Sequence, residues 1–313
     1  MLDALAALLK AVLYTGVLSC AGAVFARATL RLPPDSTQLL SQLMRRGAAL
    51  TILAVVASAG CLFLRLGAGF DTATLSAVFH SSVGAAICLQ IAGAGLLLAS
   101  ADSDDSSRAT QLSNAALVTA SFAFNGHAAA NGLTAGIVAF LHVSLAAWWV
   151  ASLWVLRDAC GRLESAAVTA LVLRFSAIAF GLVGGLVIAG LLLVGTLVEF
   201  DRDPWLSGYG QLLAVKIGIV IVALAFASYN KIRLTARLVR GDTLATRSLR
   251  RMISAELVCI GAVLTATAIL TTYTSPHDDP IGPTFGENTW SPAISSTPAL
   301  PPAWAPWSKA TKS

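Results

Sequence analysis

Long apolar stretches, separated by short polar segments, dominate the chain. Each stretch approaches or exceeds the roughly 20 apolar residues that a helix needs to cross a lipid bilayer. Backbone polar groups in lipid have to be satisfied within the segment, so each stretch is predicted to be a helix. The predicted spans are residues 4–26, 48–66, 74–99, 112–130, 134–156, 175–198, 208–229 and 251–273. The pattern predicts an all-α polytopic membrane protein, an eight-transmembrane-helix bundle.

The composition agrees with this pattern. Of the 313 residues, 56% are hydrophobic and only 12% are charged, whereas a soluble domain has about 25% charged residues. A net charge of +5 would fit a nucleic-acid-binding protein. The basic residues, however, lie in the short loops between apolar stretches, where they orient membrane helices.

The last forty residues have a different character. Residues 274–313 are rich in Pro, Ser and Thr and contain no apolar run. Such a composition buries too little apolar surface to fold by itself. We therefore expect a transmembrane domain over residues 1–273 and an extracytoplasmic tail, irregular or disordered, over residues 274–313.

The distribution of Lys and Arg predicts the orientation. Fifteen of the 21 basic residues lie in the first, third, fifth and seventh predicted loops, and only four lie in the other loops and the tail. Cytoplasmic loops carry the excess of basic residues. The odd-numbered loops are therefore predicted to be cytoplasmic, with both termini on the outer side (N-out/C-out).

This orientation places all four histidines in the outer half of the protein: His80, His127, His142 and His277. Imidazole is a common ligand of copper and zinc. His127 and His142 flank a very short connection, so their helices are expected to be antiparallel neighbours. We predict a metal site formed by His127 and His142, with His80 or His277 as further ligands. The alternative is that each histidine only forms a hydrogen bond with a neighbouring helix.

Two charged residues within the predicted spans are candidates for a polar pathway. Lys216 lies in the seventh span and Glu256 in the eighth. Ionisable side chains inside a membrane are energetically unfavourable and usually face the bundle interior. The alternative is a structural ion pair. For a third such residue, Lys10, an amine that reaches the membrane surface is the favoured interpretation.

Several short motifs follow one another between residues 120 and 276. In chain order they are Gly126-His127-Ala128, His142 with Trp149 seven residues later, Arg174-Phe175-Ser176, Tyr209-Gly210 with Leu213 and Lys216, Asn230-Lys231, Leu249-Arg250-Arg251 before Glu256, and Pro276. This order resembles the CopD family of copper-resistance membrane proteins. One departure is Ala151-Ser152, where the family usually has two glycines.

The resemblance implies a multi-pass protein of the bacterial inner membrane that handles copper ions. Such proteins are thought to move copper from the periplasm to the cytoplasm, often beside a periplasmic copper-binding protein of the CopC type. The chain has no P-loop. Transport would therefore be passive or driven by an ion or redox gradient.

The sequence is also compatible with two other functions. One is a b-type haem redox protein with a single outer haem, bound by His127 or His142 together with His80. The predicted inner half contains no histidine. This disfavours a pair of stacked haems that would transfer electrons across the membrane. The other is a membrane assembly factor without transport of its own. We expect a transporter and not an enzyme, because no Ser/His/Asp or HExxH arrangement is present.

Overall fold

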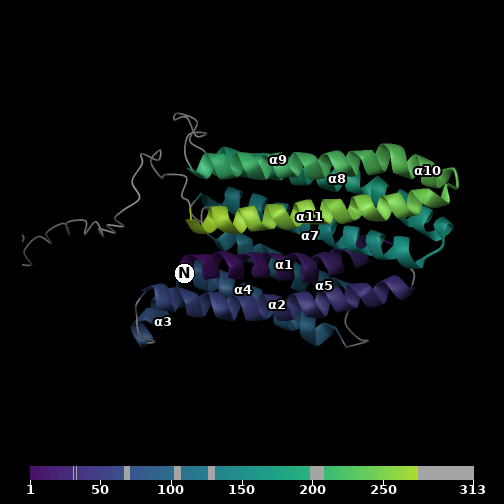
Figure 1. The fold of residues 1–313 in the computed structure, drawn as a ribbon. Coiled ribbons are helices and arrows are strands. Elements are labelled where there is room, and N and C mark those ends of the chain that lie inside the picture. The colour runs from purple at the N-terminus through teal and green to yellow at the C-terminus, as the bar shows by residue number, and fades with distance from the viewer. Residues whose placement is uncertain are drawn as a thin grey trace, which may run out of the picture. The chain divides into compact units, whose positions relative to one another are not determined.

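The computed structural model describes residues 1–30, 32, 34–66, 71–101, 107–125, 131–197 and 208–273. By its contacts the chain divides into two units, Met1–Pro280 and Ile281–Ser313, and every described residue belongs to the first. The described residues form helices and no strands (Figure 1). The helices are α1 (Leu2–Thr29), α2 (Pro34–Leu66), α3 (Thr72–Phe79), α4 (Ser82–Ser100), α5 (Arg108–Ala120), α7 (Gly132–Arg162), α8 (Ser165–Leu197), α9 (Gly208–Tyr229), α10 (Thr235–Val239) and α11 (Thr243–Tyr273), with a 3₁₀ turn η1 (Ser121–Phe124) and a π-helical segment η3 (Asn230–Leu234).

Seven helical segments of the described chain are long and apolar enough to cross a membrane. They correspond to seven of the eight predicted spans. The fourth predicted span, residues 112–130, is shorter in the structure: α5 and η1 end at Phe124, and residues 126–130 lie outside the described residues. The α5 helix nevertheless packs against α1, α4 and α7. The eightfold count and the orientation therefore stay predictions.

The third predicted span, residues 74–99, is divided into two helices. α3 ends at Phe79 and α4 begins at Ser82. The Ser81 hydroxyl accepts a hydrogen bond from the Gly84 backbone N–H, which caps the start of α4, as serine commonly does at this position. The prediction that His80 lies inside one continuous helix is therefore wrong: His80 lies at the junction of α3 and α4, before the candidate span that begins at Ser82, and its side chain is exposed.

The closest packing in the bundle involves α1, which lies against both α2 and α7. A Cβ atom added to Gly47 in α2 would lie 2.6 Å from the Cys20 amide nitrogen in α1. One added to Gly22 in α1 would overlap the Ala147 carbonyl oxygen in α7. Small residues let membrane helices approach to backbone contact, so these glycines define the two interfaces.

The C-terminal end of α1 is connected to two other helices by polar contacts. Two nitrogens of Arg174, Nε and one terminal nitrogen, donate to the Thr29 carbonyl oxygen at 3.0 and 2.8 Å. This carbonyl belongs to the last helical turn and has no partner within α1. The Trp148 indole N–H donates to the Thr29 hydroxyl at 2.7 Å, and its ring stacks on Phe175 at a centroid distance of 5.5 Å.

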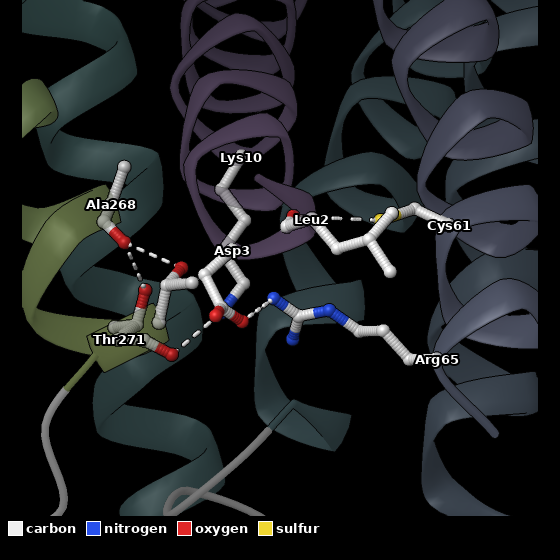
Figure 2. Close-up of polar contacts among 8 residues, drawn as sticks. Leu2, Asp3, Lys10, Cys61, Arg65, Ala268 and Thr271 are labelled. Atoms are coloured by element: carbon white, nitrogen blue, oxygen red, sulfur yellow. Dashed lines mark hydrogen bonds and ion pairs between the residues drawn. The ribbon is translucent and has the colours of Figure 1, made fainter. Parts of the chain in front are cut away.

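The opposite end of α1 carries a second set of polar contacts (Figure 2). Asp3 forms an ion pair with Arg65 at the end of α2. Lys10 Nζ donates to the Thr271 carbonyl oxygen in α11 at 2.6 Å. The Lys10 amine is therefore used to satisfy a carbonyl in the last turn of a neighbouring helix.

The α8 and α9 helices are much less enclosed than the others. Few of their residues are buried, and large apolar side chains such as Phe180, Leu191 and Ile221 are exposed. Each packs chiefly against one partner, α8 against α7 and α9 against α11. A helix with apolar side chains on all sides is stable in lipid and not in water, so the fold is that of a multi-pass membrane protein.

Candidate functional site

The structure places two of the four predicted histidine ligands. His80 is exposed at the end of α3, where its Nδ1 lies 2.8 Å from the Ser76 carbonyl oxygen. His142 is partly buried in α7. His127 and His277 lie outside the described residues. Within the described part of the chain, no group of three or more His, Cys, Asp or Glu side chains could hold a metal ion. The site formed by His127 and His142 stays a prediction.

The imidazole of His142 lies between α7 and α8. Its Nδ1 is 3.2 Å from the Leu186 carbonyl oxygen in α8. A Cβ atom on Gly190, one turn further along α8, would lie 3.2 Å from the ring, so glycine makes room for it. A carbonyl oxygen only accepts hydrogen bonds, and Nδ1 therefore carries the proton. The neutral ring then has the Nε2 lone pair, the form that binds a metal ion.

Lys216 lies at a similar depth in the neighbouring part of the bundle. At 1.5 Å per residue, His142 is about 15 Å from the start of α7 and Lys216 about 12 Å from the start of α9. The Lys216 side chain is partly buried, as is that of His142.

A second polar contact lies between α9 and α11. Glu256 in α11 is only 1% exposed, and its carboxylate accepts a hydrogen bond from the side-chain amide of Asn230. Among the described residues, the amide oxygen of Asn230 is buried and has no partner. Asn230 also begins the π-helical segment η3. Short π-helical insertions occur frequently at functional sites.

Lys216 in α9 and Asn230, which begins η3 directly after α9, share one face of the continuous helix. The buried positions Tyr209, Leu213, Ala223 and Asn230 follow each other at spacings that return to the same side of a helix, and Lys216 falls on this series. The helix packs this face against α11. The two polar residues are therefore separated by four helical turns, about 21 Å, along one interhelical seam.

The sequence indicated only part of this arrangement. It singled out Lys216 and Glu256 as charged residues within spans, but it did not identify Asn230 as the partner of Glu256. Asn230 was visible only as one element of a family motif. The contact depends on how α9 and α11 are aligned, which a linear pattern does not contain. The same holds for Leu186 and Gly190, which surround His142.

The fold and the buried polar residues define the class: a polytopic α-helical membrane protein with ionisable groups along interhelical seams. Residues 1–137 match the family model described as "Copper resistance protein D-like, N-terminal domain", and residues 169–270 match "Copper resistance protein D". The chain belongs to the copper resistance protein D family. It is thus a membrane protein whose function is related to copper resistance.

These matches locate the candidate residues relative to the family. Lys216, Asn230 and Glu256 fall within the second match, and His80 and His127 within the first. His142 lies between the two matched regions. Comparisons with curated proteins and with solved structures gave no match.

Proposed function

We propose that this protein is a transporter that moves copper ions from the periplasm to the cytoplasm across the bacterial inner membrane. The observation that carries the proposal is the buried carboxylate of Glu256. It lies within a span, in the region that matches the copper resistance family, and no cation pairs with it among the described residues. A buried carboxylate with one amide donor is energetically unfavourable in lipid. A cation passing through the bundle supplies the missing countercharge.

The proposed orientation, with both termini outside, follows from the distribution of Lys and Arg. It places His142 in the outer half of the bundle and Asn230 with Glu256 toward the inner side. Copper would first contact imidazole groups: Nε2 of His142, together with His127 and with His80 or His277. A periplasmic copper-binding protein of the CopC type is the proposed donor. Soft and borderline nitrogen ligands suit copper at such an entry site.

In this proposal, Lys216 and Glu256 shape the path between the two sides. The positive charge of Lys216, at a depth similar to that of His142, would disfavour stable capture of the ion and promote its onward movement. Glu256 then attracts the ion at the inner end of the seam between α9 and α11. Asn230 orients the carboxylate through its amide N–H, and its amide oxygen is free to accept or coordinate within the described part of the site.

The test is copper uptake into vesicles that contain the purified protein. Glu256→Gln keeps the shape of the side chain and removes its charge, and His142→Ala removes the imidazole. We expect uptake to fall by on the order of tenfold or more in each variant, because a charged or ligating contact is lost. Glu164→Gln is the matched control, since it removes a carboxylate that is exposed.

Equal copper uptake by wild type, Glu256→Gln, His142→Ala and Glu164→Gln would contradict the proposed path. An absorption spectrum of the purified protein separates the transporter from the redox alternative. A Soret band that is lost in His142→Ala would show that the imidazole binds haem. If cells that produce wild type, Glu256→Gln or His142→Ala contain the same amount of copper, the assembly-factor alternative is favoured instead.

A further inference from the structure

A basic hollow lies at the end of the bundle where α7 ends and α11 begins. It has a volume of about 360 Å³ and is lined by Arg247, Arg250, Arg251 and Ser254. The three arginines occupy positions i, i+3 and i+4 of α11, so they project from one side of the helix. The orientation of membrane helices requires basic residues in loops, but it does not require three of them to line one hollow.

The carboxylates near this end are paired with other arginines. Asp158 forms an ion pair with Arg162 at 2.9 Å, and Asp242 forms one with Arg237 at 2.7 Å. In the described part of the chain, none of the three arginines of the hollow has an acidic partner. Like charges at these spacings repel each other. An anion in the hollow would remove this repulsion.

Contacts with α7 hold the α11 residues that line the hollow. The Arg157 guanidinium donates to the Ser254 hydroxyl at 2.9 Å and lies over the Trp154 ring. Ser254 in turn donates to the Arg250 carbonyl oxygen at 2.8 Å. Gly161 faces the Arg250 guanidinium, and a Cβ atom there would lie 3.2 Å from its central carbon. Glycine therefore lets this guanidinium lie close to the α7 backbone.

The surface next to the hollow is apolar and exposed. Val258 lies one turn beyond Ser254 on α11 and is 72% exposed, and Leu244, one turn before Arg247, is 61% exposed. The guanidinium groups lie next to an exposed apolar helix face. This combination matches a phospholipid, in which a charged headgroup is joined to acyl chains. Arginine forks also match phosphate oxygens in geometry. A free phosphate ion would use the arginines but not the apolar face.

We propose that Arg247, Arg250 and Arg251 bind the phosphate of an anionic phospholipid headgroup, with an acyl chain along Val258. Basic pockets between transmembrane helices bind such headgroups in other membrane proteins. The site depends on the membrane assignment of the chain and not on copper transport. It therefore stands or falls independently of the proposed function.

The experiment measures phosphatidylglycerol binding to the full chain in a neutral detergent by native mass spectrometry, together with the shift in the midpoint of thermal unfolding. The test variant is the triple substitution Arg247→Gln, Arg250→Gln, Arg251→Gln. The matched control is Arg46→Gln, Arg233→Gln, Arg240→Gln, which removes the same charge from exposed arginines outside the hollow. We expect the test variant to bind on the order of tenfold more weakly or worse, and the control to bind like wild type.

Two further measurements test the geometry of the site and distinguish a lipid from a free phosphate ion. Gly161→Leu retains every charge but displaces the Arg250 guanidinium, and we expect it to weaken phosphatidylglycerol binding as well. Inorganic phosphate at the same phosphate concentration should leave the unfolding midpoint almost unchanged. A thermal shift from phosphate equal to that from phosphatidylglycerol would overturn the lipid assignment. Equal binding by the test and control variants would overturn the site itself.

Discussion

The α1–α2–α7 region and the α8–α9 pair are packed in very different ways, although all five helices are apolar and long. α1 contacts α2 and α7 at backbone distance through Gly47 and Gly22. In α8, by contrast, a Cβ atom on Gly181 or Gly184 would meet nothing within 4 Å. The first region is a close-packed scaffold, and the second consists of helices held mainly along one side.

The difference matters because polar residues of the proposed path lie in, or contact, the less enclosed helices. Lys216 and Asn230 belong to α9 and its π-helical extension, and the carbonyl that contacts His142 belongs to α8. Segments with few buried contacts open at lower free energy than a packed core. In the proposed transport function, α8 and α9 would shift against this scaffold as the ion passes.

The largest expected effect is that of filling a close contact in the scaffold. Gly22→Ala should destabilise the protein by about 3 kcal/mol or more, because the methyl group overlaps the α7 backbone and neither helix can yield easily. Gly181→Ala should be neutral or stabilise the protein by up to about 1 kcal/mol, since alanine has the higher helix propensity. Thermal unfolding in detergent compares the two. Similar unfolding midpoints for the two variants would contradict the difference in packing between the scaffold and α8.

A smaller effect is expected at the contact between α9 and α11. Glu256→Ala should reduce stability by about 1–3 kcal/mol, because the buried amide of Asn230 loses its acceptor. Adding Asn230→Ala to this variant should recover part of the loss. A double-mutant cycle from unfolding midpoints measures this coupling. Strict additivity would mean that the hydrogen bond does not hold α9 against α11.

The connection between α8 and the scaffold can be weakened at one residue. Arg174→Gln should lower stability by about 1–2 kcal/mol, because the Thr29 carbonyl loses two guanidinium hydrogen bonds. Arg233→Gln removes an exposed arginine and serves as the control. Hydrogen exchange should increase at the first turns of α8 in the test variant alone. An increase confined to α1 would contradict the role of Arg174 as an anchor of α8.

The smallest effect concerns α3, which has no buried residue. The backbone N–H of Thr74 donates to the Asp71 carboxylate and lowers the pKa of that carboxyl. The cap therefore contributes fully above the ordinary pKa of aspartate and is lost as the pH falls through the lowered value. Amide exchange in α3 should increase at acidic pH in wild type. Asp71→Ala should show the increased exchange at neutral pH and no further change on acidification.

Much of the architecture was predictable because a bilayer imposes a strong constraint on sequence. Seven helices occur where apolar stretches of sufficient length predicted them. The division of the third stretch was missed, since Ala, Val and Phe around His80 are as apolar as the rest. The chain leaves the helical conformation at Ser81, whose backbone is extended and whose hydroxyl caps α4. Local hydrogen bonds of this kind are weak signals inside an apolar stretch.

The candidate site was predictable only as residue types. A charge in a span is conspicuous, so Lys216 and Glu256 could be named from sequence. Their partners could not, because Asn230 and Leu186 are brought near by the rotation and alignment of packed helices. Four imidazoles in one half of the topology likewise suggested a cluster. The structure gives His142 a backbone carbonyl in α8 as its partner and places His80 at the exposed end of α3.

By itself, the sequence determined the helical membrane class, the family and the sidedness we propose, because apolar length and basic loops are local properties read along the chain. Only the tertiary structure decided which helices form the scaffold, that Asn230 meets Glu256, and that three arginines of α11 line one hollow. Those outcomes depend on backbone approach at a few glycines and on the rotation of each helix about its axis. Neither quantity is encoded in hydropathy, since apolar residues occur on every side of these helices.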